Sequence, residues 1–112
     1  MVIHFTSRHF KAHESLNEYA ENAVQQVAHF FDGVIRTDVV LSFEKKHKST
    51  KIAEVHVSVH NAVLVGVGKS EDFFKSIDEA VEKVTAQVKR YKSKLKEKDR
   101  DKVRKVRGKL TP

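Results

Sequence analysis

The spacing of apolar residues switches between two periods along this chain, and the order of the switches leaves few folds open. Four segments alternate between two faces, as strands do: residues 2–7, 39–43, 53–59 and 63–68. Apolar residues recur at spacings of three and four in residues 16–31 and 71–98, as in helices with one buried stripe. This order predicts an α+β fold, β-α-β-β-β-α, with a four-stranded sheet and two helices packed on one face.

The predicted helix ends depend on capping residues. Ser15 followed by Glu18 suits a capping box for the first helix, and His13 is an alternative cap nearer the N-terminus. Gly33 is expected to close this helix, because glycine tolerates the left-handed backbone conformation. Ser70 is the expected cap of the second helix.

The fourth predicted strand alternates Leu64, Gly66 and Gly68 with three valines. Small residues on one face let a helix approach a sheet closely, so both glycines are expected to face the helices. A helix over residues 71–98 would be roughly 42 Å long, against about 27 Å for an eight-residue strand. We therefore expect the end of the second helix to project beyond the sheet.

Positive charge is concentrated around this projecting end. Residues 89–109 hold twelve of the 22 Lys and Arg and three acidic residues, so this window carries +9 and the rest of the chain −2. Because clustered cations release counterions from a phosphate backbone, the window predicts a polyanion-binding surface or else a solvated tail. Helical geometry places the cations on two flanks: Lys83, Arg90 and Lys94 on one, and Lys89, Lys92 and Lys96 on the other.

The length of the chain, 112 residues, suits one domain. We expect residues 1–98 to form a single α+β domain. Residues 99–112 alternate Asp with Arg at first, and Gly108 and Pro112 interrupt regular structure, so a basic, disordered C-terminal tail is predicted there.

Other classes of protein lack their characteristic residues here. The absence of cysteine excludes disulfides and thiolate sites, in agreement with a reducing cytoplasm. The longest apolar stretch, residues 62–67, is far too short to span a bilayer. A soluble, cytoplasmic protein without membrane contact is predicted.

Catalysis and metal binding find no support in the sequence. His56 and His60 share a strand face about 13 Å apart, too far for two ligands that each sit roughly 2 Å from one zinc ion. The chain has no nucleophile elbow, no phosphate-binding glycine loop and no helical His-Glu-x-x-His motif. We therefore predict no enzymatic activity, no metal, no cofactor and no small-molecule substrate.

Several stretches resemble one known family. They are GKSEDFFKSID at residues 68–78, KV at 83–84, QV at 87–88 and KRYK at 89–92, with IHFTSRH at 3–9, FFD at 30–32 and VVLS at 39–42. In this order and spacing they resemble the ribosome hibernation-promoting factor and ribosome-associated translation inhibitor family, also called sigma-54 modulation proteins. The likeness covers about residues 1–95 and is to the short type of member.

The resemblance implies a non-enzymatic protein, monomeric when free, that binds the small ribosomal subunit and its ribosomal RNA. Members occupy the decoding region and hold the ribosome idle under stress or in stationary phase. Carried over to this chain, the expected RNA contacts are Lys83, Lys89, Arg90, Lys92 and Lys94, with Lys96 beside them and with Arg8, Lys45, Lys46 and Lys48 as secondary candidates.

The first helix departs from the family pattern, and two other functions stay open. Residues 14–29 contain no Lys or Arg, so the second helix is expected to carry more of the RNA contact. One alternative is a self-associating interaction module that uses an apolar strip on the exposed sheet face: Val2, Val40, Val63, Val65 and Val67. The other is a generic double-stranded RNA-binding domain.

Overall fold

Six elements follow one another in the predicted order. The computed structural model describes residues 2–8, 11–44 and 50–110, and beyond Leu95 it describes the helical backbone alone. The elements are β1 (Val2–Ser7), α1 (Glu14–Phe30), β2 (Arg36–Glu44), β3 (Thr50–Val59), β4 (Ala62–Ser70) and α2 (Phe73–Leu110). The predicted α+β class and the β-α-β-β-β-α order are confirmed.

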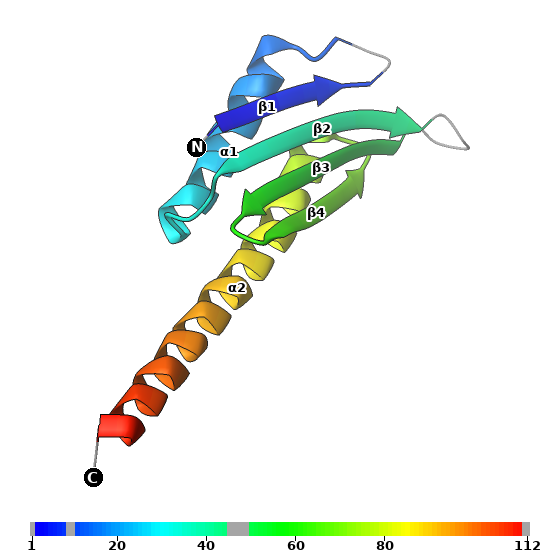
Figure 1. Ribbon diagram of the computed structural model, residues 1–112. Coiled ribbons are helices and arrows are strands. Elements are labelled where there is room, and N and C mark those ends of the chain that lie inside the picture. The colour runs from blue at the N-terminus through cyan, green and yellow to red at the C-terminus, as the bar shows by residue number, and fades with distance from the viewer. Residues whose placement is uncertain (1, 9–10, 45–49, 111–112) are drawn as a thin grey trace.

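The four strands form one sheet in the order β1-β2-β3-β4 (Figure 1). β1 lies parallel to β2, because α1 carries the chain back between them, and β2, β3 and β4 are antiparallel neighbours. In the register, Val39 of β2 lies between Phe5 of β1 and Val55 of β3. Alternate side chains therefore point to the same face along all four strands.

Both helices cover that face and bury their apolar stripes on it. α1 contributes Ala20, Val24 and Val27, which are fully buried, at the spacing of one helical face. The buried stripe of α2 runs from Ile77 to Val88. All of these residues meet the inward side chains of β2 and β3 in one core.

α2 lies unusually close to β4 because two strand residues have no side chain. A Cβ atom on Gly66 would collide with the backbone carbonyl oxygen of Ala80, and one on Gly68 with that of Ser76. Both glycines thus face the helix layer, as their alternation with valine predicts. The backbone of the helix packs directly against the strand.

The capping of α1 differs from the capping-box prediction. The helix begins at Glu14, and the His13 ring accepts a hydrogen bond from the backbone N–H of Ser15 at 3.3 Å, so the alternative cap is the one in use. The chain leaves the helix at Phe31, which is extended (φ −152°) and packs its ring 5.5 Å from that of Tyr91. No glycine among the described residues has a positive φ, so the left-handed closure expected at Gly33 is wrong.

α2 also differs from the prediction at both ends. Asp72 caps it by accepting the backbone N–H of Phe74 at 2.9 Å, whereas Ser70, the predicted cap, bonds the buried hydroxyl of Ser76. The helix continues to Leu110, past the predicted end near residue 98, over a stretch rich in the good helix formers Lys and Arg. The division into a domain and a tail stays a prediction, since the side chains beyond Leu95 lie outside the described part.

Candidate nucleic-acid interface

The second half of α2 projects from the body of the protein, as the sequence predicts (Figure 1). Its 38 residues span about 57 Å, whereas the ten residues of β3, the longest strand, span about 33 Å. The molecule measures 69 × 27 × 18 Å as a result. The basic C-terminal half of α2 therefore extends beyond the end of the sheet (Figure 1).

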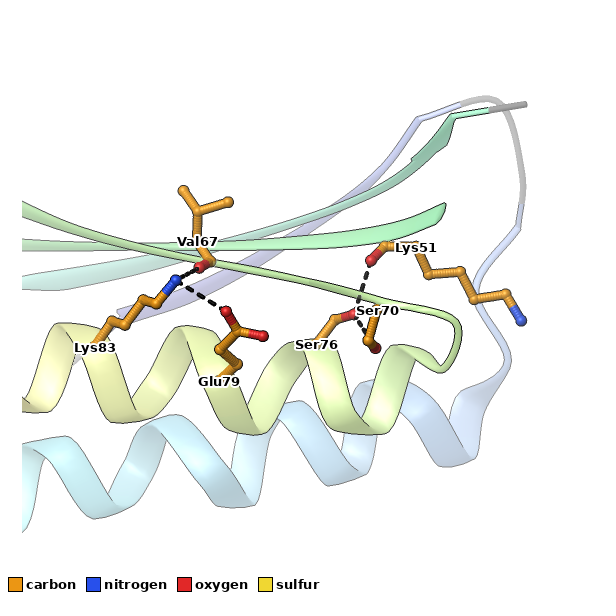
Figure 2. Close-up of polar contacts among 6 residues, drawn as sticks. All are labelled: Lys51, Val67, Ser70, Ser76, Glu79 and Lys83. Carbon is orange, nitrogen blue, oxygen red and sulfur yellow. Dashed lines mark hydrogen bonds and ion pairs between the residues drawn. The ribbon is translucent and has the colours of Figure 1, made fainter. Parts of the chain in front are cut away.

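Two of the predicted RNA-contacting lysines are bonded within the fold. The Lys83 ammonium donates to the backbone carbonyl oxygen of Val67 at 3.0 Å and pairs with Glu79 at 2.9 Å, as Figure 2 shows. The hydrogen bond that Lys83 donates to Glu79, together with the lysine charge, holds the pKa of the Glu79 carboxyl below its usual value. Lys92 donates at 3.0 Å to the carbonyl oxygen of Phe30, where a cation is favourable at the C-terminal end of α1.

Lys83 belongs to a row of three α2 side chains that reach the strand beside the helix. Gln87 donates to the backbone carbonyl of Val65, and Tyr91 donates to that of His60 at 2.6 Å. Positions 83, 87 and 91 follow one another at one-turn intervals. The sequence shows this spacing, but only the structure shows that all three donate to backbone carbonyls.

Three other cations of α2, Lys89, Arg90 and Lys94, have side chains that are exposed and accessible to a ligand. The Lys89 ammonium lies 4.9 Å from the centre of the Phe30 ring, in a cation–π contact that leaves the side chain exposed. Arg90 and Lys94 are exposed on the flank that Lys83 begins. Within the part of the chain whose side chains are described, neither makes an ion pair or a side-chain hydrogen bond.

The secondary candidates lie elsewhere. Arg8 is exposed just after β1, and its backbone N–H donates to the carbonyl of Leu41 at 2.9 Å. This is the end of the sheet at which α2 starts, so the structure does not bring Arg8 together with Arg90 or Lys94 (Figure 1). Lys45, Lys46 and Lys48, together with the side chain of Lys96, lie outside the described residues.

A groove of about 660 Å³ runs between α1 and α2. Its walls combine aromatic, amide and charged side chains, among them Tyr19, Asn22, Gln26, Phe30, Glu82 and Lys89. Tyr19 crosses it and donates a 2.6 Å hydrogen bond to Asp78. This hydrogen bond, with some burial and the carboxylate charge, raises the pKa of the Tyr19 hydroxyl above its ordinary value. No sequence pattern indicates this groove, because its walls come from two separate helices.

The outer face of the sheet is not a continuous apolar strip. Val2 pairs with Arg36 and Val40 pairs with Glu54, so charged residues separate both valines from those of β4. Arg36 in turn forms an ion pair with Asp38 at 2.8 Å. The predicted five-valine strip is corrected to three valines on one strand, at positions 63, 65 and 67.

The described residues contain neither a metal-binding cluster nor a membrane-spanning helix. Among the residues that the structure describes, no group of three or more His, Asp or Glu side chains is arranged to hold a metal ion. No helix within the same residues combines the length and the apolar character that crossing a membrane requires.

The fold and the site define a class of small α+β domain, in which a terminal helix carries exposed cations past a four-stranded sheet. Within this class the family is clear: the model of the Sigma 54 modulation protein / S30EA ribosomal protein family matches residues 3–96, and the chain belongs to that family. The resemblance read from the residues is thereby confirmed.

Individual relatives agree with this membership. The chain is 25% identical over 97 residues to the ribosome hibernation promoting factor of Salmonella typhimurium and 23% identical to that of Klebsiella oxytoca, with 87% of this chain and 99% of either relative covered. Among solved structures, the N-terminal domain of Thermus thermophilus Protein Y is 26% identical with a TM-score of 0.72, covering 81% of this chain and 99% of that one. A ribosomal subunit interface protein from Coxiella burnetii, 20% identical with a TM-score of 0.75, shares the fold over 83% of this chain and 99% of its own.

Proposed function

We propose that this protein binds the small ribosomal subunit at its decoding region and holds the ribosome idle, without catalysing a reaction. It does so in the cytoplasm under stress or in stationary phase, and its partner is ribosomal RNA. Membership of the family over residues 3–96 supports ribosome binding, as does the near-complete coverage of relatives named ribosome hibernation promoting factor.

The observation that carries the assignment of the interface is a pair of exposed cations on α2 that have no partner among the described side chains. Arg90 and Lys94 lie one turn apart on one flank of α2, on either side of Tyr91, its last core contact. Lys89 and Lys92 stand on the other flank, with their ammonium groups near the end of α1. A ridge with cations on both flanks can lie between two phosphate backbones.

The contributions of the candidates differ in this proposal. Arg90 and Lys94 make the primary phosphate contacts, with Lys89 and Lys92 next, because reaching RNA costs the latter two an internal contact. Lys83 mainly stabilises the fold, through its bonds to Val67 and Glu79. Lys96, Arg8 and the lysines at positions 45, 46 and 48 are retained as further contacts. Phosphate contacts carry no sequence information, so the shape of the decoding region supplies the specificity.

Co-sedimentation with ribosomes over a range of salt concentrations tests the proposal. Changing Arg90→Gln and Lys94→Gln together should weaken binding and reduce the log-log salt slope by about 1.4 to 1.8, since each lost phosphate contact removes about 0.7 to 0.9. Lys75→Gln is a matched control, because Lys75 is an exposed cation nearer the start of α2. The melting temperature should be unchanged in both variants.

Two results would contradict the proposal. Equal affinity for unrelated RNA duplexes and for ribosomes would indicate generic double-stranded RNA binding. Concentration-dependent light scattering by the free protein, combined with an absence of ribosome binding, would indicate self-association through the valines of β4.

A further inference from the structure

The groove between α1 and α2 combines flat apolar walls with polar groups that have no partner among the described residues. The Tyr19 side chain is 37% exposed and that of Phe30 45%, although both are large apolar groups, so their rings border the groove where solvent reaches it. Asn22 and Gln26 stand one turn apart on the α1 wall, and Glu82 stands on the α2 wall. Within the described part of the chain, none of these three side chains makes a hydrogen bond or an ion pair.

Charge is distributed unevenly along the groove. At one end Lys89 lies over the Phe30 ring, and the row of exposed cations on α2 begins there. At the other end, Asp78 and Glu82 line the walls near Tyr19. A phosphate is attracted to the Lys89 end and repelled from the carboxylates. The carboxylate end instead suits a neutral group that donates N–H bonds.

A nucleotide has this distribution of charge. Its anionic phosphate is joined through the sugar to a flat, uncharged base that stacks on aromatic rings and presents N–H donors and acceptors at its edge. Amide side chains both donate and accept, whereas a carboxylate only accepts. A peptide rich in Lys or Arg fits less well, because Lys89 and the neighbouring cations would repel it.

We infer that this groove binds one unstacked nucleotide of the RNA that the protein contacts, with the phosphate at Lys89 and the base between Asn22, Gln26 and Glu82. The inference rests on the proposed function. Guanine is the preferred base, because its N1–H and amino group offer the Glu82 carboxylate two parallel donors. Contact through neutral amides would give α1, which has no Lys or Arg, a part in RNA binding.

The first test separates base contacts from phosphate contacts. The double variant Asn22→Ala, Gln26→Ala should weaken ribosome binding about tenfold and leave the log-log salt slope unchanged, since no phosphate contact is lost. Alanine suits exposed helix positions, so the fold is retained, and the circular dichroism spectrum verifies this. Gln25→Ala is the matched control, because Gln25 is an exposed amide of α1 outside the groove.

The second test addresses the base itself. A short single-stranded uridine oligoribonucleotide with one central guanosine should bind more tightly than the all-uridine strand, and Glu82→Gln should abolish the difference. Competition by a polylysine peptide for the groove, or equal binding of both strands, would overturn the inference.

The two proposals fail in different ways. If the protein does not bind ribosomes at all, the proposed function is refuted. If it binds, loses salt slope in the Arg90, Lys94 double variant and tolerates the Asn22, Gln26 double variant, only the nucleotide site is refuted.

Discussion

Lys83 and Lys92 illustrate how a cation on a basic helix can serve the fold instead of a ligand. Each donates to a backbone carbonyl oxygen, Lys83 to Val67 and Lys92 to Phe30. Both hydrogen bonds are exposed to solvent and each contributes at most about 1 kcal/mol, but each ties α2 to another element and so gives its lysine a structural role. The periodicity places them correctly on the flanks of α2. It contains no information on which flank positions meet another element.

The hydrogen bond between Tyr19 and Asp78 leads to a pH-dependent prediction. The pKa of the Tyr19 hydroxyl is raised because the protonated form donates to the carboxylate. The contribution of this group to stability is therefore fully present below its unfolded pKa of about 10, and it is lost as the pH rises through the higher folded value.

Spectrophotometric titration of the tyrosinate band should show the Tyr19 transition move to lower pH in Asp78→Ala. Tyr19→Phe identifies the transition, since the chain has two tyrosines. Glu82→Gln is the control, because Glu82 borders the same groove without bonding Tyr19. A titration that is identical in Asp78→Ala and the wild type would show that the hydrogen bond is not formed in solution.

At the scale of elements, hydrophobic periodicity was sufficient for the type and order of all six. The ends of the helices were harder to predict, because a cap depends on which hydrogen-bond partners a side chain has in the fold. Ser70 is a good cap by composition, but its hydroxyl is hydrogen-bonded to that of Ser76, and the Ser76 hydroxyl lies 2.7 Å from the carbonyl oxygen of Lys51, to which it donates (Figure 2). Asp72 therefore takes the capping position. Such a competition involves β3, a neighbour that sequence spacing does not show.

The contact of α2 with β4 should tolerate added side-chain volume less than any other part of the fold. In Gly68→Ala the new methyl group meets the backbone oxygen of Ser76, which cannot rotate away. Overpacking of this kind costs about 1 to 3 kcal/mol in the free energy of unfolding, to be measured by urea denaturation. Val65→Thr, on the opposite face of the same strand, is the control and should cost much less. Equal stability of the two variants would mean that the helix does not lie this close to the strand.

The whole molecule is much less compact than a globular chain of its length. Its radius of gyration is 18.0 Å, whereas a compact domain of this size has about 13 Å. The difference comes from α2, whose last core contact is Tyr91. The overhang itself was predictable from comparing helix and strand lengths. The groove could not be predicted from the sequence, because predicting it requires knowing that α1 and α2 lie side by side.

Stopping the chain after Leu95 should therefore separate binding from stability. The melting temperature should change little, since the core ends before that point. Ribosome affinity and its salt slope should fall, because residues 96–109 contain eight Lys and Arg. The helical circular dichroism signal should decrease by about fifteen residues if α2 continues to Leu110, and hardly at all if residues 99–112 form the predicted tail.

A full-length chain with those eight residues changed to Gln is the control. It keeps the length of the helix and removes only the charge. If it bound ribosomes as well as the wild type while the shortened chain did not, reach rather than charge would be the property that the overhang provides.

The row formed by Lys83, Gln87 and Tyr91 has a consequence for assembly. β4 is an outer strand, and its exposed backbone acceptors would normally invite a strand of another molecule to extend the sheet. Val65 and Val67 already have donors from within the chain, so an incoming strand would have to displace them. These internal donors oppose strand addition at β4 without a proline or a bulge in that strand.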